Sequence, residues 1–174
     1  VDPGPTERLL GGSNGVGTLY KINTDGTGFA VLKSFLGSDG QNPVAALALS
    51  GGVLYGATTA GGSPGYGTLF RIATDGAGFG VLRHLTSAGG SNCRSQLFIS
   101  GATLYGTASG GGSGGFGTLF KMGTDGSDYT VVREFTTVDG TSPAGGVILS
   151  GGSLIGTTAG GGAYGGGTLF AANP

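Results

Sequence analysis

The chain repeats itself every 50 residues without an insertion, and this period constrains the fold more than any other sequence feature. Gly-Thr-Leu followed by an aromatic residue occurs four times, and Thr-Asp-Gly, Ser-Gly and Leu-x-Gly each recur in the same phase. The four copies of the first motif are Gly17–Tyr20, Gly67–Phe70, Gly117–Phe120 and Gly167–Phe170. One period is therefore one structural module, and the chain is a tandem array of such modules.

Each period predicts two hairpins of short antiparallel strands. In the second copy, the apolar runs Gly67–Ile72 and Phe79–Leu85 flank an Asp-Gly turn, and such turns supply the positive φ angles of a tight hairpin. The facing pairs that a symmetric turn predicts are Ile72 with Phe79 and Phe70 with Val81. Leu69 and Leu82 then lie on the other face.

The second hairpin joins Gln96–Ser100 to Thr103–Thr107 through a two-residue loop. Its predicted facing pairs in the three copies are Leu49 with Leu54, Ile99 with Leu104, Leu149 with Leu154, Phe98 with Tyr105 and Ile148 with Ile155. Apolar residues on both faces indicate a sheet that is covered on both sides. With 43 glycines among 174 residues and no sustained helical period, the sequence predicts an all-β protein.

Four antiparallel strands in each period are typical of the blades of a β-propeller. We expect residues 1–8 to form an N-terminal extension and 9–174 one repeat domain. Within that domain the partial repeats are 9–43 and 144–174, and the full repeats are 44–93 and 94–143. These segments give about three and a half blades, below the usual four to eight of a closed ring. A three-lobed fold such as a β-trefoil has a similar number of strands in each repeat and is the alternative.

Two stretches of the sequence also resemble a known family. Gly17–Phe35, which reads GTLYKINTDGTGFAVLKSF, and Leu54–Gly62, which reads LYGATTAGG, are similar to the GloVer-type tandem repeat. The resemblance implies a propeller-like fold and a secreted or surface-anchored bacterial protein. It implies no catalytic activity, since none is established for that family.

Both ends of the repeat domain are partial repeats, and we expect another chain to complete them. The edges proposed for this contact are Leu9 and Leu10 at one end and Leu169 and Phe170 at the other. An unpaired, uncharged sheet edge invites pairing with another chain. Head-to-tail contact would build an open filament, two chains could instead close one ring, or the sequence is a window of a longer array.

The residues that most often carry catalysis or bind metals are sparse. His84 is the only histidine, and it stands where the other copies carry Ser34 and Glu134, so we expect an exposed edge side chain rather than a catalytic base. Cys93 is a lone cysteine, either a spare residue or a reactive thiol. The recurring Asp25, Asp75 and Asp125 each precede a glycine and are best explained as turn residues rather than calcium ligands. We expect no cofactor, no metal and no enzymatic activity.

Aromatic residues near the tips of glycine-rich loops are the candidate contacts for a ligand or partner: Tyr66, Phe116 and Tyr164. Such rings suit stacking on sugars or insertion into a partner, or they fold back onto a neighbouring blade. Three recurring cations, Lys33, Arg83 and Arg133, are expected to be solvated strand ends, loosely paired with carboxylates.

The composition limits the partners. A net charge of −1 with eight scattered Lys and Arg residues argues against nucleic acid, and no apolar run is long enough to cross a membrane. The leading hypothesis is a non-catalytic, extracellular structural protein that assembles with copies of itself. The alternative is a propeller that binds carbohydrate or protein through its loop aromatics.

Overall fold

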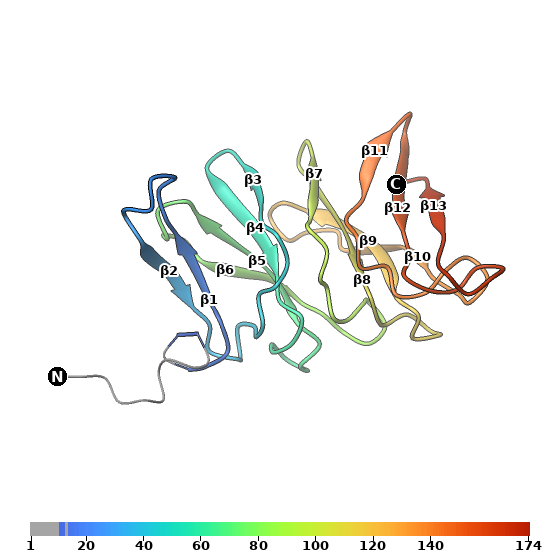
Figure 1. Cartoon of the computed structure of the whole chain (residues 1–174), viewed down its shortest axis with the longest axis horizontal. Coiled ribbons are helices and arrows are strands. Elements are labelled where there is room, and N and C mark those ends of the chain that lie inside the picture. Colours follow the sequence, from blue (N-terminus) through green and yellow to red (C-terminus); the bar gives the residue numbers. More distant parts are fainter. Residues whose placement is uncertain (1–10, 13) are drawn as a thin grey trace.

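The structure, a computed structural model, describes residues 11, 12 and 14–174. It consists of four antiparallel sheets that follow one another along the chain in a row (Figure 1), and we call them blades 1 to 4. Blade 1 contains β1 (Thr18–Lys21) and β2 (Ala30–Ser34). Blade 2 contains β3 (Ala48–Ser50), β4 (Val53–Ala57), β5 (Thr68–Ala73) and β6 (Gly80–His84). Blade 3 contains β7 (Phe98–Ser100), β8 (Thr103–Ala108), β9 (Thr118–Gly123) and β10 (Thr130–Glu134). Blade 4 contains β11 (Ile148–Ser150), β12 (Ser153–Thr157) and β13 (Leu169–Ala172).

The predicted all-β fold with propeller-like blades is confirmed. Within each blade the strands pair in chain order, so every blade is a simple meander. Blades 1 and 4 lie at opposite ends of the row, and no described strand of one pairs with a strand of the other (Figure 1). The described sheets therefore form an open row rather than the three-lobed alternative.

The register of the second hairpin agrees with every predicted pair. Leu49 faces Leu54, and the equivalent pairs follow in the other two copies: Ile99 with Leu104, Leu149 with Leu154, Phe98 with Tyr105 and Ile148 with Ile155. The two-residue loops fix this register because they leave no slack between the strands.

The Asp-Gly hairpin is less symmetric than predicted. Phe70 faces Val81 as expected, but a bulge places Leu69 opposite Arg83, and Phe79 lies outside β6. The pairing of Ile72 with Phe79 is therefore wrong. The Phe79 ring instead packs against Phe35 and Phe70, with ring centroids 5.8 Å away in each case. Packing of this ring at the contact with blade 1 outweighs continuation of the strand pair.

The core lies between the blades rather than inside any one of them. One buried cluster joins Phe35 of blade 1 to Phe70 and Ile72 of blade 2, and their side chains are fully or almost fully buried. A second cluster joins Leu69 and Tyr55 of blade 2 to blade 3. The third joins blade 3 to blade 4 and contains Phe135, Phe170, Tyr105, Leu119, Val147 and Leu154. Each blade thus depends on its neighbour to cover an apolar face.

The glycine of the Leu-x-Gly motif makes room for the aromatic residue of the Gly-Thr-Leu motif. Gly106 faces Phe120 across β8 and β9, and the same pairing joins Gly56 to Phe70. A Cβ atom on Gly106 would lie 2.5 Å from the tip of the Phe120 ring and 2.7 Å from Leu97. The ring therefore lies over the glycine, and the two motifs recur together because each requires the other.

We expect Gly106→Ala to destabilise the protein by about 1–3 kcal/mol, because the added methyl group displaces the buried Phe120 ring. The matched control is Gly80→Ala in β6, where an added Cβ meets no atom within 4 Å. That control should leave the stability unchanged or raise it slightly, because alanine restricts the unfolded chain. Denaturant unfolding of both variants measures the difference, and equal effects would contradict the account.

Candidate functional site

Blade 1 exposes an apolar face whose equivalents are buried or half-buried in the interior blades. Tyr20, Ile22 and Phe29 are 58%, 52% and 62% exposed. One period later, Phe70 and Ile72 are fully or almost fully buried against blade 1. The rings of Tyr20 and Phe29 lie against each other, with centroids 5.5 Å apart. We call Tyr20, Ile22 and Phe29 the blade 1 face.

Blade 4 exposes an apolar face on its other side, the side that packs on the following blade in the interior of the row. Leu169 is 76% exposed, whereas its equivalents Leu69 and Leu119 are fully buried. Ile148 is 60% exposed, and its equivalent Ala48 is buried. In an interior blade these positions pack against the following blade. The two end blades therefore expose apolar faces that correspond to the two sides of an interior blade-to-blade contact.

The four predicted assembly edges fall in different environments. Leu169 is exposed, but Phe170 is buried in its own chain, with its ring centroid 4.9 Å from that of Phe135. Leu9 and Leu10 lie outside the described residues. Residues of the blade 1 face were not singled out from the sequence, although comparison of Tyr20 with Phe70 across one period would have found them.

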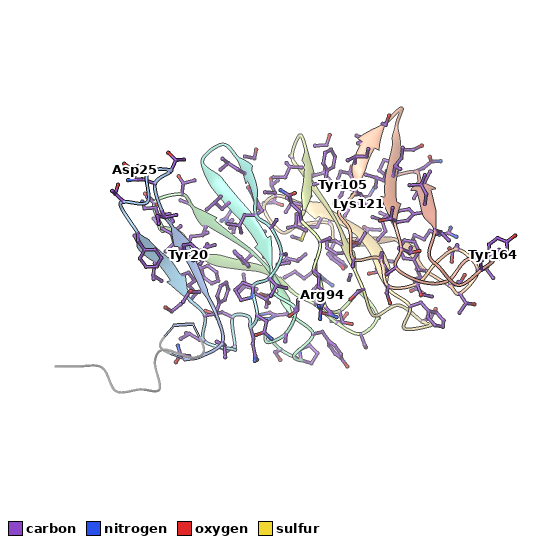
Figure 2. The ribbon with its side chains drawn as sticks, in the orientation of Figure 1. Tyr20, Asp25, Arg94, Tyr105, Lys121 and Tyr164 are labelled. Carbon is purple, nitrogen blue, oxygen red and sulfur yellow. The ribbon has the colours of Figure 1, made fainter. Side chains whose placement is uncertain are left out.

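The three predicted loop aromatics lie on equivalent loops of consecutive blades. Tyr164 is fully exposed at the blade 4 end of the row, far from Tyr20 (Figure 2). Tyr66 and Phe116 are also exposed, but less so. Their backbone carbonyls accept hydrogen bonds from the N–H groups of Asn92 and Ser142, at 3.2 and 2.8 Å, so the segment that leads to the next blade holds these loops in place. The backbone of these loops is therefore anchored, while the rings of Tyr66 and Phe116 are 40% and 37% exposed.

The recurring aspartates do the turn chemistry that the sequence predicts. Asp25 accepts hydrogen bonds from the N–H and hydroxyl groups of Thr27 at 2.9 and 2.7 Å, and Asp125 accepts the same pair from Ser127. The pKa of Asp25 is lowered mainly by the hydrogen bond from the Thr27 hydroxyl. The pKa of Asp125 is lowered mainly by the hydrogen bond from the Ser127 N–H group. Their carboxylates are therefore engaged within the turns.

His84 is exposed, as predicted, and has a structural contact that the sequence did not indicate. Its Nδ1 accepts a hydrogen bond from the N–H group of Ser63, at 3.2 Å. One period later Glu134 accepts from the N–H and hydroxyl groups of Ser113, and this bonding lowers the pKa of the carboxylate. Both residues tie a glycine-rich loop to the outer strand of its blade, so different residue types perform one task at this position.

Cys93 is a core residue. Its side chain is fully buried in the cluster between blades 2 and 3, and burial raises the pKa of the thiol to about 11. A thiol that stays protonated and buried is a poor nucleophile, which favours the interpretation as a spare cysteine.

Two of the recurring cations lie over aromatic rings of the next blade rather than being merely solvated. Lys33 lies 4.4 Å from the ring centroid of Phe79, and Arg83 lies 4.0 Å from that of Tyr129. The expected carboxylate pairs also occur, between Lys33 and Asp39 and between Arg133 and Asp139. A cation over an aromatic ring contributes about 0.5–2 kcal/mol, depending on its desolvation. These cations therefore join blades.

The described residues contain no group of three or more His, Cys, Asp or Glu side chains placed to hold a metal ion. Across the same part of the chain, there is no helix with the length and apolar character needed to cross a membrane.

A family model described as the Gloeobacter/Verrucomicrobia repeat matches residues 8–174. The chain belongs to this repeat family. No curated protein matches the sequence of this family member. Among solved structures, it is similar to a chain in the crystal structure of a nidogen/laminin complex, with a TM-score of 0.59 and 15% identity. The match covers 82% of this repeat chain and 49% of the other, so it spans about half of that chain and supports the fold alone.

Because the folded pKa of Asp125 lies below its ordinary value of 3.8, its charge stabilises the fold above that pH. The contribution is lost as the pH falls through the lowered pKa. We expect Asp125→Asn to be less stable than wild type at neutral pH, and the gap to narrow below about pH 4. Urea unfolding between neutral and acidic pH measures the gap. A gap that stays constant down to the lowest pH would contradict a role for the charge.

Proposed function

We propose that this chain is a non-catalytic structural protein of the extracellular space that associates head to tail with copies of itself through its end blades. The observation that carries the proposal is the contrast between the blade 1 face, which is more than half exposed, and its buried equivalents Phe70 and Ile72. A continuous apolar patch of this kind is typical of a surface that contacts another protein. The exposed Leu169 and Ile148 at the other end supply the matching half.

A contact between two different faces leaves one free face at each end of the assembly until the copies close a ring. Such a contact builds a ring if the rotation between copies closes and an open filament if it does not. The low charge of the chain, −1 overall, opposes neither result, because repulsion between copies is small. The extracellular setting and the structural role are in keeping with the repeat family and with side chains that are occupied in turns, loop ties and blade contacts.

We expect the chain to form oligomers whose size rises with concentration, visible by sedimentation velocity and by negative-stain microscopy. Phe29→Lys should weaken this association by about tenfold or more, because it would bury an unpaired charge. The matched control is Val138→Lys, which makes the same change at a side chain that is 82% exposed. A chain that stays monomeric at every concentration would overturn the proposal, and so would equal effects of the two variants.

The second candidate function is carbohydrate binding by the loop aromatics. Complete exposure of the Tyr164 ring favours it, because a free ring on a loop can stack on a sugar. The matching experiment is a glycan array with wild type and Tyr164→Ala. Binding that is lost in the variant would support this function, and an array that is blank for wild type would contradict it.

A further inference from the structure

The contacts between consecutive blades repeat with fixed spacing. A cation in the last strand of one blade lies over an aromatic residue 46 positions later, as Lys33 of β2 does over Phe79 and Arg83 of β6 over Tyr129. A threonine at, or one residue before, the start of the third strand donates its hydroxyl hydrogen to a carbonyl 29 positions earlier. The three examples are Thr68 to Asp39, Thr118 to Gly89 and Thr168 to Asp139, at 3.0, 3.0 and 2.8 Å.

Among the described residues, Arg133 and Phe29 each lack a partner for the contact between a cation and an aromatic ring. Arg133 is the third member of the cation series, and no aromatic ring of the described residues lies beneath it as Phe79 and Tyr129 lie beneath Lys33 and Arg83. Phe29 is the member of the aromatic series that comes one period before Phe79, and no cation of the described residues lies over its exposed ring. In a second copy that continues the row three periods later, Phe29 would stand 46 positions after Arg133. This is the spacing at which Phe79 follows Lys33 and Tyr129 follows Arg83.

β13, the third strand of blade 4, has a smaller side chain at one core position than the equivalent strands of blades 2 and 3 have. β13 carries Ala172 where β5 and β9 carry Ile72 and Met122, both of which are buried. β1 carries Ile22 at this position, and there Ile22 is 52% exposed. The hairpin β1–β2 therefore has the larger side chains that this position takes in the interior blades, and nothing described covers them.

We propose that blade 4 is completed in trans: the β1–β2 hairpin of a second copy pairs with β12 and takes the place of β13. The result is a four-stranded blade, with β11 and β12 from one chain and β1 and β2 from the next. This inference rests on the proposed head-to-tail association and specifies which strands of the two copies pair. Exchange of equivalent segments between copies costs little, because the contacts that are lost are replaced by the same contacts in trans.

In this arrangement every repeated contact is made. Phe29 of the second copy lies beneath Arg133, and Ile22 replaces Ala172 in the core. Thr18 of the second copy takes the place of Thr168 and donates to the Asp139 carbonyl. The second copy's own blade 2, which already packs on Leu19 and Phe35, then covers Ile148 of the first copy.

Stacking of blade 1 against an intact blade 4 makes none of these contacts. The cation, the aromatic residue equivalent to Phe35 and the carbonyl equivalent to that of Asp39 all come from the fourth strand and the loop after it. The described part of blade 4 ends its sheet at β13 and supplies none of the three. The repeated contacts therefore favour exchange over stacking.

The test is a disulfide between two singly substituted chains. Tyr55 faces Arg71 and Tyr105 faces Lys121 in the interior blades, so exchange places Ile155 of one copy opposite Lys21 of the next. Mixed Ile155→Cys and Lys21→Cys chains should form a covalent heterodimer at least about tenfold faster than the control pair Val138→Cys and Lys21→Cys. The native Cys93 is buried and does not interfere.

A second variant, which lacks residues 167–174, removes the segment that competes for the same place. Exchange predicts that it associates several-fold more tightly than wild type, whereas stacking predicts weaker association. If the chains associate but the Ile155–Lys21 pair forms no faster than the control, exchange is overturned and the proposed function stands. If cross-linking is found instead between Leu169→Cys and Tyr20→Cys, stacking replaces exchange. A wild-type chain that does not associate at all overturns both proposals.

Discussion

Packing of one blade on the next is the interaction on which the rest of the structure depends. The strands are short, of three to six residues, and a sheet of such strands has little stability alone. Its apolar side chains lie on both faces, and the three buried clusters each draw residues from two consecutive blades. Stability is therefore shared between neighbours, as in other repeat proteins.

The packing of each blade on its neighbour also explains which side chains are engaged within the chain and which apolar side chains are exposed. His84, Glu134, Asp25 and Asp125 are the side chains that usually attract functional hypotheses, and each one holds a turn or a loop in place. The end faces contain ordinary core residues, and they are conspicuous only because Tyr20 and Leu169 are exposed where their equivalents are buried. The proposed association therefore uses the two unpaired ends of a contact that is repeated along the row of blades.

Much of the fold could be predicted from the sequence, because the period and the two-residue loops fix the hairpin registers, as Leu49 and Leu54 show. The bulge beside Leu69 could not, since it depends on how Phe79 packs against a different blade. The contact of Arg83 with Tyr129 was missed for the same reason. The sequence shows which positions are equivalent, and only the arrangement of the blades shows which positions meet.

Native-state hydrogen exchange of the wild-type chain tests most directly whether each blade depends on its neighbours. In dilute solution the account predicts the weakest protection of amide hydrogens in β1, β2 and β13, whose blades have only one neighbouring blade among the described residues. Protection of β1 and β2 should rise as the concentration is raised, while the interior strands β5 and β9 stay as they were. Uniform protection along the chain, unchanged by concentration, would contradict the account.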